Sequence, residues 1–191
     1  MLLGDVAGKG VPAALIMVRF SVEVRAALLT EPDPAAAFGR VNSALQQLRQ
    51  MDRFVTLMGV ILDPAVHTVT LVNAGHPPPL LLRPGKVPVE AAPRASGGPA
   101  IGLFENASYT CCSQRLEPGD CIVLFSDGVT DAMSMSGRQF GRKGVEAAVR
   151  GCRTLPATVG QTLLDAINRH AANCSQSDDI TLLCFGRTAE A

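Results

Sequence analysis

The chain has 191 residues, 47% of them hydrophobic, which is typical of a globular protein with a sizeable core and excludes disorder as the main state. It carries 17 basic and 17 acidic residues, so no charge excess points to nucleic acid or to an anionic membrane. Trp is absent and aromatic residues make up 4%, which disfavours a stacking platform for bases. The longest apolar run, 11–18, is too short to span a bilayer, and the N-terminus lacks the pattern of a signal peptide. We therefore predict a cytoplasmic protein with no nucleic-acid or membrane partner.

The first half of the chain predicts a strand, two helices and a hairpin. Residues 1–3 form the end of a buried strand, and an Ala-rich helix covers 12–29. Asp33 and Pro34 are a favourable N-cap and first-turn residue for a second helix, whose core-facing stripe is Phe38, Val41, Leu45 and Leu48. The predicted hairpin consists of strands at 54–62 and 68–72.

The second half predicts further strands, with helices near the C-terminus. Residues 87–102 are rich in Pro, Gly and Ala, and we expect them to form a surface loop. This order lacks the strict strand–helix alternation of a parallel sheet, so we predict an α+β fold with mostly antiparallel sheets. The remaining predicted elements are strands at 80–82, 109–115, 121–125 and 180–185 and helices at 145–150 and 156–172.

Six cysteines are present, and none forms a C-x-x-C pair, so a zinc knuckle is not expected. Most of them lie in apolar stretches. We predict that they are small buried hydrophobic residues with free thiols, as in a reducing cytoplasm.

Aspartates recur where apolar strands begin or end. Asp5 follows the first strand, Asp127 follows the strand at 121–125, and Asp178 and Asp179 precede the last strand. If these strand ends lie at one edge of the fold, the carboxylates converge and need a cation or a proton to be stable together. A ligand set of oxygens without a Cys or His cluster favours a hard cation, Mg²⁺ or Mn²⁺. Each aspartate alone is weak support, because aspartate is also a common turn residue.

Four segments together resemble the SpoIIE/RsbU-type branch of the PP2C-like, metal-dependent protein phosphatases. They begin with Gly-Asp-Val-Ala-Gly-Lys-Gly, continue with Asn-Ala-Gly-His-Pro-Pro-Pro and Phe-Ser-Asp-Gly-Val-Thr-Asp, and end with Ser-Asp-Asp-Ile-Thr. Their order is that of the family, and they extend over nearly the whole chain. The segments are residues 4–15, 73–80, 124–132 and 176–181.

The resemblance implies that residues 1–191 form one PP2C-like αββα sandwich with a centre of two Mg²⁺ or Mn²⁺ ions. Asp5 would bridge the ions, with the Val6 carbonyl as a further ligand, and Asp127 and Asp178 would complete one metal site. Asp179 matches the neighbouring position. A metal-activated water would attack phosphorus in line, without a phosphoenzyme.

The resemblance also implies a substrate and partners. The usual substrate of this branch is a phosphoserine or phosphothreonine on a small regulatory protein, such as a STAS-like anti-anti-sigma factor. An upstream sensor or receiver domain is expected in the full-length protein. Lys9, beside a glycine turn, and His76, in a Pro-rich corner, are candidates for contact with the phosphate or for an outer-sphere role, although an exposed lysine and a structural histidine are the simpler interpretations.

One departure from the family pattern concerns the region before residue 1. Family members carry an upstream hairpin with an acidic Gly-Asp-Phe-Tyr-Asp type of motif, which this chain does not include. We expect the chain as given to lack the first strand or strands, to bind metal weakly and to have low activity. We also expect an exposed edge at 1–6 that can pair with a second chain and form a dimer.

Four alternative interpretations compete with a metal-dependent phosphatase. A P-loop fails on spacing, because three residues separate Gly4 from Gly8 and no Ser or Thr follows Lys9. A dinucleotide-binding turn is disfavoured because the next strands form a hairpin, and a nucleophilic Ser126 or Thr130 lacks a His–acid partner nearby. The serious alternative is a catalytically impaired phosphatase-like domain that binds a regulatory protein.

Overall fold

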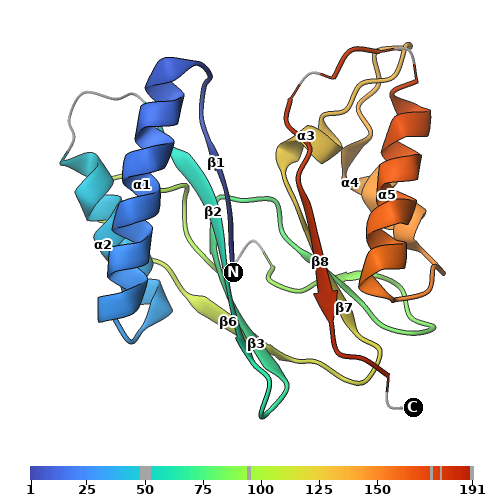
Figure 1. Ribbon diagram of the computed structural model, residues 1–191, viewed down its shortest axis with the longest axis horizontal. Helices are drawn as coiled ribbons and strands as arrows, with labels where there is room; N and C mark the ends of the chain where they lie inside the picture. The colour runs from blue at the N-terminus through green and yellow to red at the C-terminus, as the bar shows by residue number, and fades with distance from the viewer. Residues whose placement is uncertain (48–52, 94–95, 173, 177, 190–191) are drawn as a thin grey trace. The chain divides into compact units, whose positions relative to one another are not determined.

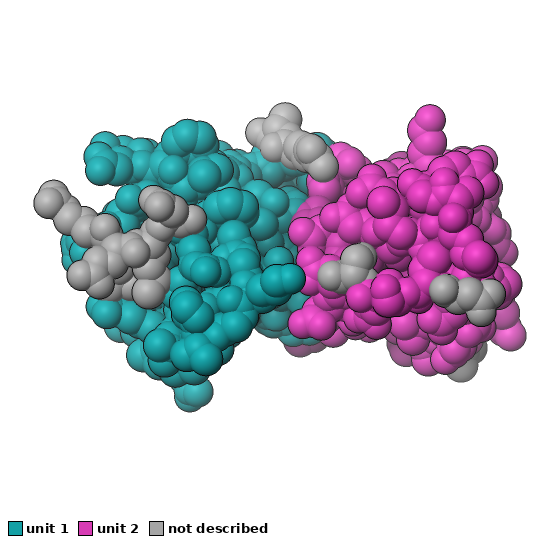
Figure 2. Space-filling view, turned by 90° about the horizontal axis from the view of Figure 1, so that it is seen from above, with its two compact units in different colours: residues 1–63, 69–76, 92–114 teal, residues 64–68, 77–91, 115–191 magenta. Residues whose placement is uncertain are grey.

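The computed structural model describes residues 1–47, 53–93, 96–172, 174–176 and 178–189. The chain divides into two compact units, coloured teal and magenta in Figure 2. The first unit comprises Met1–Asp63, Val69–His76 and Ala92–Gln114, and the second comprises Pro64–Thr68, Pro77–Ala91 and Arg115–Ala191. A four-stranded sheet with helices on one face is the central feature of each unit, which confirms the predicted α+β class.

The first sheet has the strand order β1-β2-β3-β6. Helices α1 and α2 cover one of its faces (Figure 1), and side chains from both helices join those of β1 and β2 in one core. The elements are β1 (Leu2–Val6), β2 (Val55–Asp63), β3 (Thr68–Ala74), β6 (Cys111–Arg115), α1 (Val11–Thr30) and α2 (Pro34–Gln46).

Local sequence explains how α2 begins and which side it buries. The Asp33 side chain accepts a hydrogen bond of 3.1 Å from the Ala35 amide, as an N-cap should, and Pro34 occupies the first turn. Phe38 and Val41 are 1% and 2% exposed in the core, which confirms the predicted stripe. Leu48 lies outside the described residues.

Strand β1 lies at the edge of the first sheet and pairs antiparallel with β2. Asp5 stands opposite Thr56, so these two side chains project from the same face of the sheet. Val6 stands opposite Val55, whose main-chain N and O bond to Ile101 at 2.9 and 2.8 Å. The Val6 carbonyl is therefore directed away from β2, toward the open edge.

The second sheet has the order β5-β4-β7-β8. Its helices α4 and α5 bury Val145 and Leu163 against Phe125 of β7, each 0% exposed. The elements are β4 (Leu80–Leu82), β5 (Val89–Glu90), β7 (Cys121–Phe125), β8 (Leu182–Gly186), α3 (Asp127–Thr130), α4 (Gly141–Val149) and α5 (Pro156–His170). None of the helices in the described part of the chain is long and apolar enough to cross a membrane.

Several details differ from the sequence-based expectations. The segment 87–102 contains β5, and its residues Ala100 and Ile101 are 6% and 0% exposed, so the part that is described is not a simple surface loop. Helix α4 begins at Gly141 rather than at residue 145, and the short helix α3 was not expected. All six cysteines are free, as expected, but the prediction that they are buried holds only for Cys121. Cys111 is exposed, and the other four are half-buried.

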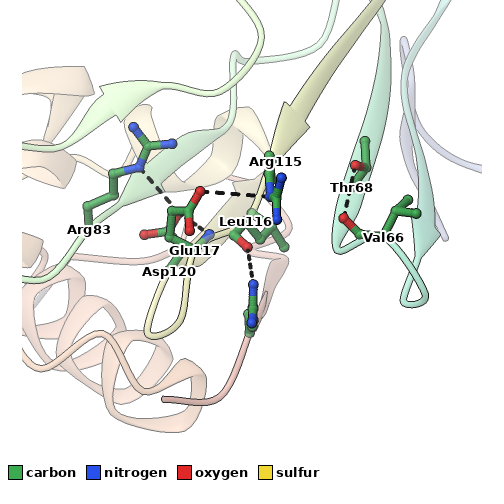
Figure 3. Close-up of polar contacts among 8 residues, drawn as sticks. Val66, Thr68, Arg83, Arg115, Leu116, Glu117 and Asp120 are labelled. Carbon is green, nitrogen blue, oxygen red and sulfur yellow. Dashed lines mark hydrogen bonds and ion pairs between the residues drawn. The ribbon is translucent and has the colours of Figure 1, made fainter. Parts of the chain in front are cut away.

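An ion pair with a buried carboxylate, Arg83–Asp120, anchors the turn before β7 (Figure 3). Asp120, whose side chain is 1% exposed, accepts hydrogen bonds from Arg83 Nε at 3.2 Å and from the Glu117 amide at 3.0 Å. Glu117 itself forms only an exposed pair with Arg115 at 4.0 Å. The buried carboxylate therefore stabilises this turn, whereas the exposed pair contributes little.

We predict that Asp120→Asn lowers the free energy of unfolding by about 1–3 kcal/mol, because the Arg83 guanidinium loses its charged partner. Glu117→Gln is the matched control and is expected to change it by less than about 0.5 kcal/mol. Urea denaturation of the two variants and the parent measures both values. Equal stabilities of the two variants would contradict the assigned role of Asp120.

Candidate metal centre

In the first unit, Asp5 lies within β1, one residue before the strand ends at Val6. Its side chain is half-buried, and that of Val6 is directed to the opposite face, into the core with α1. The turn that follows is tight: the Gly8 φ angle is 102°, and a Cβ placed there would lie 1.7 Å from Arg53 Nη1. Lys9, the next residue, is exposed.

His76 lies close to Asp5 in the first unit. Its ring is buried, and Nδ1 is 2.9 Å from Thr56 Oγ1, the hydroxyl of the residue opposite Asp5. The Asn73 side chain holds the main chain of His76 through two hydrogen bonds of 2.8 and 2.9 Å. The structure thus brings two predicted site residues, Asp5 and His76, to one face of the sheet.

In the second unit, Asp127 follows β7 and begins α3. Burial raises the pKa of its carboxyl group, and the negative charges of Asp178 and Asp131 raise the pKa further. Main-chain amides at 127 and 128 act in the opposite direction without overcoming these effects. The structure therefore brings Asp127 and Asp178 close enough to repel each other.

Sequence reasoning missed Asp131 as a member of this group. Asp131 lies four residues after Asp127, with the single helical turn of α3 between them, and this spacing puts two side chains on one side of a helical turn. Gln139 Nε2 donates a hydrogen bond of 3.1 Å to its Oδ1. The i, i+4 spacing of the two aspartates was the signal in the sequence that could have identified it.

Ser126 holds the segment that carries Asp178 and Asp179. Its hydroxyl donates to the Asp179 carbonyl at 2.9 Å and accepts from the Thr181 amide at 2.9 Å. Ser126 is 6% exposed, so these bonds lie in a largely water-excluded place. These hydrogen bonds are compatible with the expectation that Ser126 is not a nucleophile. The sequence analysis did not predict that Ser126 would hold this segment.

Gly128 allows the same segment to approach α3. A Cβ at this position would lie 2.3 Å from the Asp179 carbonyl oxygen, a contact that no side chain tolerates. The neighbouring carboxylate of Asp178 accepts a 2.8 Å hydrogen bond from the Asp179 amide. Two exposed aspartates are thus held beside Asp127 by main-chain contacts.

The donor set fits a hard divalent cation. Asp127, Asp131 and Asp178 offer carboxylate oxygens only, and their mutual repulsion is what a bound Mg²⁺ or Mn²⁺ would relieve. Within the described ranges, no group of three or more His, Cys, Asp or Glu side chains is placed so that it could hold a metal ion. Asp5 belongs to the first unit and Asp127 and Asp178 to the second, so the convergence of all three remains a prediction.

We predict that Gly128→Ala displaces the segment with Asp178 and Asp179, because the new Cβ collides with main chain rather than with a movable side chain. The expected cost is about 1–3 kcal/mol of unfolding free energy, together with weaker stabilisation by added Mn²⁺. Thermal unfolding with EDTA and with Mn²⁺ measures both effects.

The matched control is Gly39→Ala in α2, where an added Cβ has nothing within 4 Å. This variant is expected to be neutral or to stabilise the protein by about 0.5–1 kcal/mol. A Gly128→Ala protein that gains as much stability from Mn²⁺ as the control would show that the close approach is unimportant for the site.

Comparisons with known proteins agree with this architecture. Residues 1–188 match the family described as Stage II sporulation protein E (SpoIIE). Protein IcfG of Synechocystis sp. is 28% identical over 137 residues, and phosphoserine phosphatase RsbU of Bacillus subtilis is 30% identical over 138 residues. These alignments cover 72% and 71% of the chain but 21% and 40% of the relatives, so the chain spans less than half the length of either protein.

A solved structure shares the fold. The SiaA-PP2C domain of Pseudomonas aeruginosa superimposes with a TM-score of 0.81 at 23% identity, over 97% of this chain and 75% of that domain. The predicted PP2C-like fold class is thereby confirmed. Because the family match extends over nearly the whole sequence, the chain belongs to the SpoIIE family and has the fold of a PP2C-type phosphatase domain.

Proposed function

We propose that the chain is the catalytic part of a metal-dependent protein serine/threonine phosphatase. The observation that carries the proposal is the group of carboxylates around Asp127, which burial and two neighbouring charges make unfavourable without a cation. Membership of the SpoIIE family and the similarity to a phosphoserine phosphatase support the same activity.

The residues have distinct roles in this proposal. Asp5 and the Val6 carbonyl, together with Asp127 and Asp178, would hold two Mg²⁺ or Mn²⁺ ions, Asp5 as the ligand shared between them, and Asp179 matches the neighbouring position. The direction of the Val6 carbonyl, away from β2, supports its role. When bound, the ions activate a water molecule and offset the charge that develops on the phosphoryl oxygens. Lys9, exposed between two glycines, is free to approach the substrate phosphate.

The substrate we propose is a phosphoserine or phosphothreonine on a regulatory protein of the anti-anti-sigma type. Family membership supports this choice. We also propose a sensor or receiver domain in the full-length protein, because both relatives extend beyond the matched region. We also propose a dimer that forms through β1, the edge strand of the first sheet. We place the protein in the cytoplasm.

We predict that Asp127→Asn lowers Mn²⁺-dependent hydrolysis of p-nitrophenyl phosphate at least about 100-fold, because a neutral amide is a poor ligand for a hard cation. Asp165→Asn, which changes an exposed aspartate of α5 bonded to Gln161, is the matched control and should retain full activity. Equal rates in the two variants would exclude Asp127 from the centre. A parent that binds a phosphoprotein but never releases phosphate would favour the impaired binding module instead.

Asp127 also predicts how stability depends on pH without metal. Because its pKa is raised in the folded state, the folded protein binds the proton more tightly than the unfolded chain. Its contribution to stability is therefore present below the ordinary pKa of 3.8 and is lost as the pH rises through the higher folded value. In EDTA, the melting temperature of Asp127→Asn minus that of the parent should become more positive as the pH rises from about 4 to about 7. A decrease over that range would contradict the assigned repulsion.

A further inference from the structure

The proposed reaction assigns no role to Thr56, and His76 is so far a candidate only for contact with the phosphate or for an unspecified outer-sphere role. The two atoms are 2.9 Å apart, Thr56 Oγ1 to His76 Nδ1, and they come from β2 and from the corner after β3. The imidazole is 3% exposed. A buried imidazole with a fixed hydrogen bond has a defined ring orientation and a defined tautomer.

The corner that carries His76 is held rigidly. The Gly75 φ angle is 69°, its amide donates to the Gly98 carbonyl at 3.0 Å, and a Cβ at Gly75 would lie 2.7 Å from the Ala100 nitrogen. With the Asn73 side chain bonded to both main-chain groups of His76, the backbone has no freedom to reposition the ring. The hydrogen bond with Thr56 then restrains the rotation of the His76 side chain.

The ring is held on the face that carries Asp5. Directly opposed residues of antiparallel strands have Cβ atoms about 4.5–5.5 Å apart on one face of the sheet, so the Asp5 carboxylate stands beside Thr56. The next residue, Val6, points to the opposite face, into the helical core. Thr56, which bonds the His76 ring, therefore shares the face of Asp5.

We propose that Thr56 and His76 are positioning residues for Asp5: the Thr56 hydroxyl locks the imidazole, and the locked pair limits the rotamers of the Asp5 carboxylate to those that present its oxygens to a divalent ion. The inference rests on the proposed function, because it assumes that Asp5 is a metal ligand. Outer partners of this kind change metal affinity 10- to 100-fold when they are removed, by order of magnitude.

The test compares Thr56→Val, which exchanges the hydroxyl for a methyl group of similar size, with Thr56→Ser, which keeps the hydroxyl. Calorimetric titration with Mn²⁺ should give a Kd raised about tenfold or more for the valine variant and close to the parent for the serine variant. Thr70→Val is the matched control, because it removes a comparable hydroxyl pair, Thr70 Oγ1 to Ser113 Oγ at 3.0 Å, from the same sheet. Its Kd should equal that of the parent.

Two measurements without metal accompany the titration. Melting temperatures in EDTA show whether each variant is folded, and ring ¹H–¹⁵N spectra of His76 should show one tautomer in the parent and a mixture in Thr56→Val. A valine variant with the Kd of the parent, or with the single tautomer of the parent, overturns the positioning role while the proposed function stands. A folded parent that binds neither Mn²⁺ nor Mg²⁺ overturns the proposed function, and this inference with it.

Discussion

A half-buried carboxylate with other negative charges nearby is unfavourable, and the second unit contains one at Asp127. The Asp127 carboxyl loses water contacts on folding and lies near Asp178 and Asp131, which raises its pKa. Ordinary structural aspartates are arranged in the opposite way, as Asp120 shows: its carboxylate accepts hydrogen bonds from a guanidinium and an amide. Repulsion that the chain itself does not neutralise is the property expected of a cation site.

Hydrogen bonds and close packing against the main chain, rather than charged partners, maintain this arrangement. The Ser126 hydroxyl connects the end of β7 to the segment before β8, and Gly128 leaves room for the Asp179 carbonyl. The first unit has a similar arrangement after the end of β3. There Asn73 bonds to the His76 backbone, and Thr56 bonds to the His76 ring. In both units, therefore, hydrogen bonds from neutral polar side chains fix the segment that carries a candidate site residue.

The fold explains why the candidate metal ligands come from such different segments. Strand β1 is at the edge of its sheet, so Asp5 and the outward-directed carbonyl of Val6 come from a strand with one free side. Strand β7 is central and buried, so Asp127 appears only where that strand ends. An edge strand and the end of a central strand are two ways for a sheet to present oxygen ligands without breaking its own hydrogen bonds.

The sequence by itself determined the element types and the positions of the aspartates. Periodicity and capping identified α1, α2 and α5 and the hairpin β2–β3, and strand β7 was predicted at its observed bounds, because these signals are local in the chain. It did not reveal α3, the early start of α4 or the burial of Ala100 and Ile101, where tertiary contacts outweigh local preference.

Only the tertiary structure decided which small polar residues hold the candidate ligands. Ser126 bonds to a carbonyl 53 residues away, and Thr56 to a ring 20 residues away. A serine or threonine looks the same in a sequence whether it faces water or fixes a loop, because the partner is chosen by how the strands pack and not by the neighbouring residues.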